Sequence, residues 1–88
     1  MSALSADEVF EVVRDAIVTV LEIAPGTVSR DTRIVGDLGA DSLALVEIIE
    51  IIEERLMPVA AGEFHIEDAD LDDITTVGEA VDYAMARL

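Results

Sequence analysis

The sequence lacks cysteine and tryptophan, and only 3% of its residues are aromatic. Without cysteine the chain can form no disulfide, no thiolate nucleophile and no cysteine-based zinc site. No apolar run approaches the ~20 residues that a membrane-spanning helix needs. The first residues also lack the basic start and apolar stretch of a signal peptide. We therefore expect a cytoplasmic protein that folds as one domain over residues 1–88.

Positive charge is also scarce. The chain has 5 basic residues, all of them arginine, against 20 acidic ones, which gives a formal net charge of −15 at pH 7. Such a surface repels nucleic acid and anionic lipid and attracts basic partners. Disordered acidic chains have low hydrophobicity, whereas 52% of these residues are hydrophobic. We expect a folded domain with one modest core, because a chain this short buries only about 60% of its unfolded surface. That leaves little room for a deep catalytic cleft.

Helical periodicity and capping residues organise the first half of the chain. A helix is predicted over residues 5–23, because Ser5 and Glu8 have the spacing of a capping box and apolar residues then recur every three or four positions. Pro25 ends this pattern. Residues 24–40 contain glycine and proline without a sustained period, so they are predicted to form a long ordered loop.

The second half predicts two longer helices and one short one. The last helix begins with another capping-box pair, Thr76 and Glu79. The predicted elements are a helix from Asp41 or Ser42 to about Leu56, a loop over 57–66, one or two helical turns over 68–74, and a helix over 76–88. The fold class is therefore all-α, with three main helices, one short helix and a long loop between the first two.

The predicted second helix has two distinct faces at about 100° per residue. A core stripe is formed by Leu45, Ile48, Ile49, Ile52 and Leu56. The opposite face, which we call the docking face, is formed by Leu43, Val46, Glu47, Glu50, Glu53 and Glu54. Two apolar residues beside four carboxylates suggest a surface that binds a partner. The alternative is an irregular amphipathic helix, since isolated apolar residues are ordinary on protein surfaces.

One stretch, Asp37-Leu38-Gly39-Ala40-Asp41-Ser42-Leu43, has the features of a modification site. It places a serine where a helix begins, after a loop that contains glycine, and the positive end of the helix dipole there favours an attached phosphate. The chain has one histidine, His65, and no Gly-x-Ser-x-Gly sequence, so nothing activates Ser42 as a nucleophile. We predict that another enzyme modifies Ser42. The alternative is that Ser42 only caps the helix.

This stretch resembles the phosphopantetheine attachment site of acyl carrier proteins, where a D-x-G-x-D-S-L pattern surrounds the modified serine. Ile74-Thr75-Thr76-Val77-Gly78-Glu79-Ala80 is similar to the run that opens the last helix of that family, and the similarity covers nearly the whole chain. The resemblance implies a right-handed four-helix bundle of the acyl-carrier type that is not an enzyme. It also implies a 4'-phosphopantetheine arm attached covalently to Ser42, between Asp41 and Leu43, that holds acyl groups as thioesters.

The same resemblance implies the partners. A phosphopantetheinyl transferase would transfer the arm from coenzyme A to Ser42. Ketosynthases, acyltransferases and tailoring enzymes would then approach the docking face with basic patches. The chain would be a monomer that binds no nucleic acid, membrane or metal.

Three departures from fatty-acid carriers favour a carrier of polyketide or other secondary-metabolite biosynthesis over one of primary fatty-acid synthesis. No acidic residue follows soon after Ser42, Glu50 stands where an apolar residue is common, and the segment 57–64 is longer than usual. Peptidyl carriers usually have two glycines before the serine motif. Gly39-Ala40 in this chain disfavours that branch.

A different class of function is a calcium site of the EF-hand type. Positions 1, 3, 5 and 12 of such a loop are occupied by Asp68, Asp70, Asp72 and Glu79. However, position 6 is Asp73, where the sharp turn requires glycine, and no second loop is present to pair with this one. The capping-box interpretation of Glu79 is therefore favoured.

Overall fold

The computed structural model describes residues 4–57 and 74–87. Within these ranges the chain forms α1 (Ala6–Leu21), a 3₁₀ turn η1 (Pro25–Thr27), α2 (Ser42–Leu56) and α3 (Val77–Met85). The described part of the chain is thus all-α, which confirms the predicted class. The predicted short helix over 68–74 lies outside the described residues except for Ile74.

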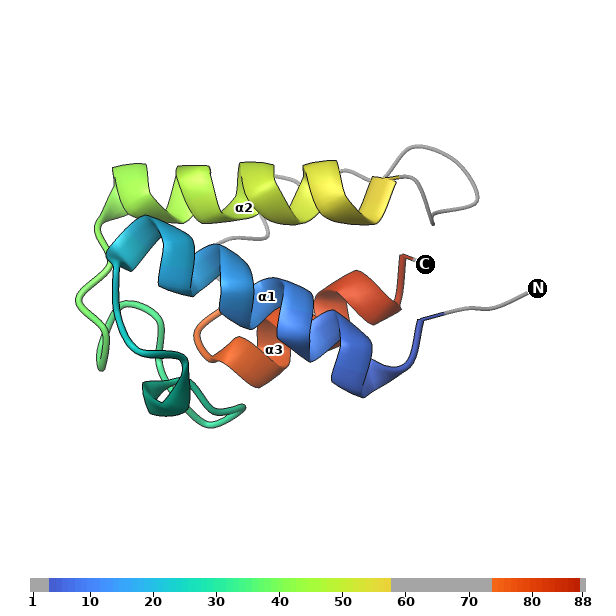
Figure 1. Ribbon diagram of the computed structural model, residues 1–88, viewed down its shortest axis with the longest axis horizontal. Coiled ribbons are helices and arrows are strands. Elements are labelled where there is room, and N and C mark those ends of the chain that lie inside the picture. Colours follow the sequence, from blue (N-terminus) through green and yellow to red (C-terminus); the bar gives the residue numbers. More distant parts are fainter. Residues whose placement is uncertain (1–3, 58–73, 88) are drawn as a thin grey trace.

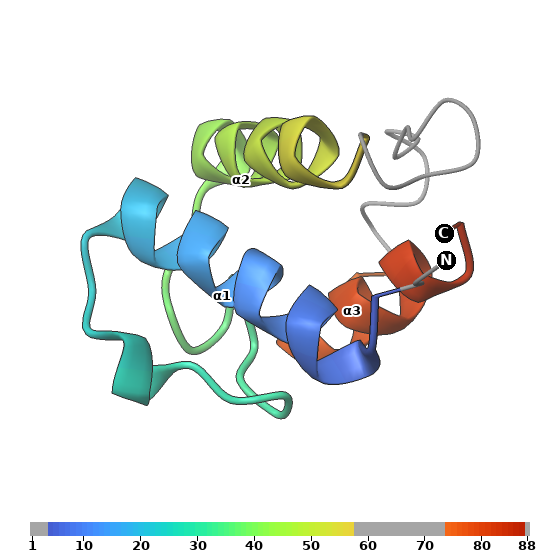
Figure 2. The same ribbon diagram turned by 45° about the vertical axis from the view of Figure 1, so that its right-hand side comes forward.

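Helix α1 lies between the other two helices. It contacts both α2 and α3, and the two ribbon views show α2 and α3 on different sides of it (Figures 1 and 2). The described residues contain no helix that is long and apolar enough to cross a membrane.

The predicted capping box sets the start of α1. The Ser5 side chain accepts a hydrogen bond from the Glu8 backbone N–H, and the Glu8 carboxylate accepts one from the Ser5 N–H. The helix ends at Leu21, two residues before the predicted end at 23, because Glu22 takes a left-handed conformation with φ 55°. Its N–H still donates to the Val18 carbonyl at 2.8 Å. The periodic apolar residues beyond Leu21 therefore extend past the helix itself.

The core is built from one face of each helix together with the loop between α1 and α2. In α2 the predicted core stripe is confirmed, except that Leu45 is only half-buried. The loop contributes Val28, Ile34 and Ala40, each almost fully buried. The buried helical residues are Val9, Val13, Ala16 and Ile17 of α1, Ile48, Ile49, Ile52 and Leu56 of α2, and Val77, Ala80, Val81 and Ala84 of α3.

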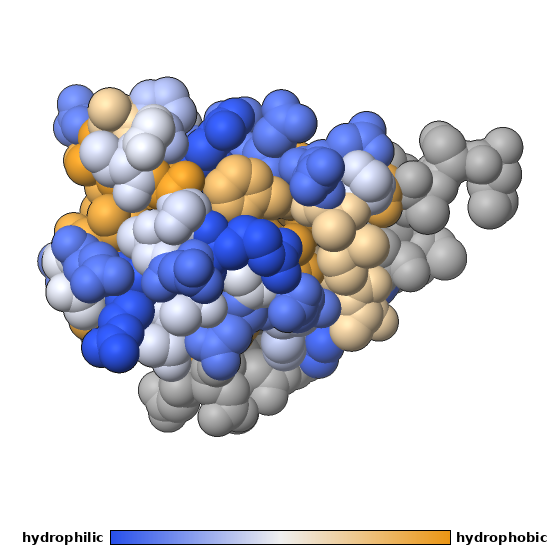
Figure 3. All heavy atoms as spheres, turned by 90° about the horizontal axis from the view of Figure 1, so that it is seen from below, coloured by the Kyte–Doolittle hydropathy of each residue, from blue (hydrophilic) through white to orange (hydrophobic). Residues whose placement is uncertain are grey.

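One face of the molecule is mainly hydrophilic (Figure 3). Seen from the side away from α2, hydrophilic residues cover most of the coloured surface, and hydrophobic residues show on the left, in the centre and in a paler patch toward the right (Figure 3). The left of the view holds the end of α1 and the loop that follows it (Figure 1).

Helix α3 begins as predicted and ends earlier than predicted. Thr76 and Glu79 form the expected capping box, and the segment before it makes an isolated antiparallel bridge between Arg33 and Thr76. The helix ends at Met85, and Ala86 and Arg87 form a turn where the prediction continued the helix to 88.

Candidate functional site

Ser42 is the first residue of α2, and it does not cap the helix. The N-cap is Asp41, whose Oδ1 accepts a hydrogen bond from the Ala44 backbone N–H at 2.8 Å. The alternative that Ser42 serves only as a cap is therefore wrong. The Ser42 side chain is exposed, and its hydroxyl makes no hydrogen bond within the described residues. Asp41 therefore caps the helix, and the Ser42 hydroxyl takes no part in the capping.

The loop ahead of Ser42 is shaped by a glycine and a buried alanine. Gly39 has φ +72°, a backbone conformation that residues with a side chain rarely adopt. A Cβ added to Gly39 would meet only open space. Its N–H donates to the Val35 carbonyl at 2.9 Å. The next residue, Ala40, is 3% exposed and packs into the core. The chain therefore turns inward at Ala40 and presents Asp41 and Ser42 at the surface.

Asp37 stabilises the same loop two residues before Gly39. Its carboxylate accepts a hydrogen bond from the Arg33 N–H at 2.9 Å, while its own N–H donates to the Arg33 carbonyl at 3.0 Å. This reciprocal pair closes a tight turn. Asp37, Gly39 and Asp41 of the motif thus have local structural tasks, and Ser42 is the motif residue with an unengaged reactive group.

The start of α2 remains open to an anion. The first helical hydrogen bond runs from Leu45 N to the Asp41 carbonyl, and Ala44 N is taken by the Asp41 side chain. Within the described residues the N–H groups of Ser42 and Leu43 donate no hydrogen bond. Unpaired N–H groups at a helix N-terminus favour a phosphate. A phosphate joined to Ser42 Oγ therefore suits this position.

The predicted docking face is mostly exposed. Leu43 and Val46 are 67% and 45% exposed, which is high for large apolar residues. Glu47, Glu50 and Glu54 are exposed as well, whereas Glu53 is half-buried and has an interaction of its own. The structure thus brings five of the six residues onto one accessible surface and places Glu53 at its edge.

Sequence reasoning missed one residue of this surface. The sequence predicts a loop from residue 57, but Met57 follows α2 directly with helical dihedral angles and is 50% exposed. At 100° per residue it falls in the same sector as Val46 and Glu50. The spacing between Val46 and Met57 is close to three helical turns, and this spacing could have predicted that Met57 extends the docking face.

A groove lies at the other end of α2, away from Ser42. It is lined by Leu4, Glu8, Glu11, Val12, Asp15 and Arg55. Arg55 Nη1 approaches Asp15 Oδ2 at 3.6 Å and joins the end of α2 to α1. Ser42 is 13 positions before Arg55 in α2, or about 20 Å along the helix axis, so this groove is separate from the serine.

Of the four residues proposed as EF-hand ligands, the structure describes only Glu79. Glu79 Oε1 accepts hydrogen bonds from the backbone N–H groups of Thr76 and Thr75, at 2.9 and 3.0 Å. These bonds hold the pKa of Glu79 below its ordinary value of 4.5. The described residues contain no group of three or more side chains that could hold a metal ion. Asp68, Asp70 and Asp72 lie outside the described ranges.

Comparison with known proteins identifies the class of this helical domain. The family model of the phosphopantetheine attachment site matches residues 11–84. Two curated relatives carry the name acyl carrier protein. The one from Campylobacter hominis is 38% identical, over 86% of this chain and 89% of that protein. The one from Thermotoga maritima is 33% identical, over 96% of each.

The match and the fold lead to one conclusion. The chain belongs to the acyl carrier protein family, and its cofactor is a covalently bound phosphopantetheine. The all-α arrangement of α1, α2 and α3 is the fold of that family.

Proposed function

We propose that Ser42 is the residue that carries the phosphopantetheine arm. The observation that supports this assignment is the division of tasks at the start of α2, where Asp41 caps the helix and leaves the Ser42 hydroxyl exposed. In the attachment reaction, Ser42 Oγ loses its proton and bonds to the phosphorus of the arm, and the nucleotide part of coenzyme A leaves. The bound arm supplies a terminal thiol that holds acyl groups as thioesters.

The chain itself acts as a carrier and not as an enzyme. The carboxylate nearest to Ser42 in sequence, Asp41, is engaged by the Ala44 N–H. Activation of the Ser42 hydroxyl is therefore left to the phosphopantetheinyl transferase. What the chain contributes is the position of the hydroxyl, an open helix N-terminus for the phosphate, and the exposed docking face beside it.

A direct test is intact-mass measurement after incubation with coenzyme A and a broad-specificity phosphopantetheinyl transferase. Wild type should gain one phosphopantetheine, and Ser42→Ala should gain none. Ser29→Ala is the matched control, because Ser29 is also exposed but its hydroxyl bonds to Thr32 Oγ1 at 3.0 Å. Modification that persists in Ser42→Ala would overturn the assignment.

We further propose that partner enzymes bind the docking face through basic patches. Exposed charges act mainly by steering partners together. Replacing Glu47 and Glu54 with lysine should therefore lower kcat/KM for transfer to partner enzymes by about tenfold at low salt and weaken its salt dependence. The control is Asp7→Lys with Asp31→Lys, which changes the net charge equally at exposed positions outside α2. Equal losses in both double variants would show that only the net charge matters.

We assign the carrier to polyketide or other secondary-metabolite biosynthesis, with primary fatty-acid synthesis as the alternative. The support is the run Ser42-Leu43-Ala44-Leu45, which has no acidic residue, and the exposed Glu50. The test offers the malonyl-loaded carrier to a polyketide ketosynthase and to a fatty-acid ketosynthase at equal concentrations. Faster extension by the polyketide enzyme is expected, and faster extension by the fatty-acid enzyme would favour primary synthesis.

A further inference from the structure

The loop between α1 and α2 is hydrogen-bonded along the start of α3. Three backbone hydrogen bonds join the two segments, which are more than 40 positions apart in the sequence. We call this set of contacts the loop–α3 seam. Its bonds run from Ile34 N to Thr75 O, from Val77 N to Thr32 O and from Gly78 N to Arg30 O, with N···O distances of 3.0, 2.9 and 2.8 Å.

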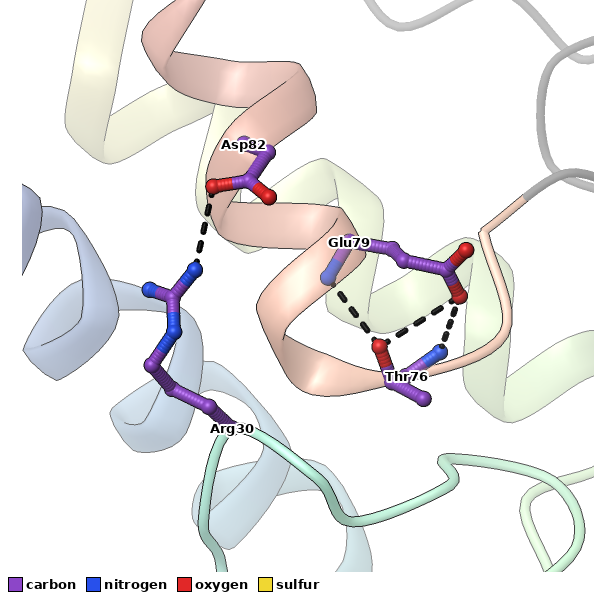
Figure 4. A network of polar contacts seen from close by, with 4 residues as sticks. All are labelled: Arg30, Thr76, Glu79 and Asp82. Carbon is purple, nitrogen blue, oxygen red and sulfur yellow. Dashed lines mark hydrogen bonds and ion pairs between the residues drawn. The ribbon is translucent and has the colours of Figure 1, made fainter.

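Side chains complete the seam at Gly78. Arg30 Nη2 donates to Asp82 Oδ1 at 3.0 Å, one helical turn beyond Gly78 (Figure 4). A Cβ added to Gly78 would lie 3.0 Å from the Arg30 carbonyl oxygen and 3.4 Å from its Cβ. The same carbonyl accepts the Gly78 N–H. A larger residue at position 78 must therefore push the loop away from α3.

One residue connects the seam to the attachment serine. Ile34 donates its N–H to Thr75, and its carbonyl accepts a hydrogen bond from Ala40 N at 3.2 Å. Ile34 and Ala40 are each only 3% exposed, so both are fixed in the core. Ala40 precedes Ser42 by two residues. A shift of the loop at Arg30 and Thr32 is therefore transmitted through Ile34 to the chain just before Ser42.

We propose that Gly78 and Arg30 are positioning residues for the modification of Ser42. They hold the loop between α1 and α2 against α3, in the conformation that a phosphopantetheinyl transferase recognises. This inference rests on the proposed attachment to Ser42. When only a fraction of the molecules has the binding-competent conformation, the apparent dissociation constant rises by the inverse of that fraction. A loosened seam should therefore raise the KM for the carrier and leave kcat nearly unchanged.

The first experiment measures the steady-state kinetics of phosphopantetheinylation with coenzyme A and a broad-specificity transferase. For Gly78→Ala we expect a carrier KM about fivefold higher, with kcat within about twofold of wild type. Amide hydrogen exchange should also be faster at Ala40. The matched control is Val13→Ala, a change at a fully buried position of α1 outside the seam, assayed at a temperature that gives an equal folded fraction.

A second variant keeps the test valid even if Gly78→Ala fails to fold. Arg30 and Asp82 are exposed, so Arg30→Asp and Asp82→Arg should fold singly and together. Each single change should raise KM, by less than Gly78→Ala because exposed ion pairs are weak, and the exchanged pair should restore most of the wild-type value. The two single changes alter the net charge in opposite directions, so a rise of KM in both would not follow from net charge.

The outcomes separate this inference from the proposed function. If wild type is not modified at Ser42, the attachment assignment fails and the seam has no reaction to support. If wild type is modified normally and the KM of Gly78→Ala is unchanged, only the positioning role is overturned. An equal rise of KM in Val13→Ala would also overturn it, because stability alone would then explain the effect.

Discussion

The starts of α2 and α3 are both capped by a side chain, but their remaining N–H groups are satisfied in different ways. At α3 the first four N–H groups all have protein acceptors. These are Thr32 O for Val77, Arg30 O for Gly78, Thr76 Oγ1 for Glu79 and Thr76 O for Ala80. At α2 only Ala44 and Leu45 are engaged, both by Asp41, while Ser42 and Leu43 donate no hydrogen bond within the described residues.

Burial follows the same division. Val77 at the start of α3 is fully buried, whereas Leu43 at the start of α2 is 67% exposed. Helix N-termini normally have their orphan N–H groups satisfied by caps, water or a ligand. The difference therefore separates a helix end that holds the fold together from a helix end whose exposed groups suit the cofactor and partner proposed for it.

The largest expected effect sharpens this comparison at the apolar positions. Val77→Ala should lower the free energy of unfolding by on the order of 2 kcal/mol, because it leaves a cavity in the core. Leu43→Ala should change it by less than about 0.5 kcal/mol and should instead slow transfer to partner enzymes. Urea denaturation of both variants and a loading assay measure the two outcomes. A destabilisation by Leu43→Ala as large as that by Val77→Ala would remove the distinction between the two helix ends.

The capping residues should give the next largest difference. Thr76→Ala removes the acceptor of the Glu79 N–H and should cost about 1 kcal/mol, a fall in Tm of roughly 4–8 °C for a domain of this size. Ser42→Ala should leave Tm nearly unchanged, because the Ser42 hydroxyl makes no hydrogen bond within the described residues. Thermal melts of the two unmodified proteins check this. A drop of several degrees for Ser42→Ala would mean that Ser42 has a structural task after all.

Local patterns in the sequence predicted the features that depend on near neighbours. The capping boxes at Ser5–Glu8 and Thr76–Glu79 are set by residues three positions apart, and both are confirmed. The core stripe and exposed face of α2 follow from helical periodicity alone. The accessible position of Ser42 followed from the motif and its resemblance to acyl carrier proteins.

Other features depend on choices or contacts that a local pattern does not contain. Asp41 and Ser42 are both good N-cap residues and stand side by side, so propensity could not decide which one caps α2. The end of α1 depends on Glu22 adopting a left-handed conformation, which its residue type does not indicate. Gly78 is required by the approach of the Arg30 carbonyl from far along the chain, and no spacing rule within α3 indicates that contact.

The smallest expected effect concerns the charge of Glu79 at the closed end of α3. Its carboxylate accepts hydrogen bonds from the N–H groups of Thr76 and Thr75. These bonds lower the pKa of Glu79 in the folded protein below the ordinary value of 4.5. The unfolded chain therefore binds more protons than the folded one between these two pKa values. The resulting stabilisation is fully present above the unfolded pKa and is lost as the pH falls through the folded pKa.

Glu79→Gln keeps an oxygen acceptor but has no charge to lose. The Tm of wild type should thus exceed that of Glu79→Gln at pH 7, and the difference should shrink progressively below pH 4.5. Glu50→Gln, at an exposed position of α2, corrects for the change in net charge. If the difference between wild type and Glu79→Gln, corrected in this way, stayed constant down to pH 3, the ionised carboxylate would not be what stabilises this helix end.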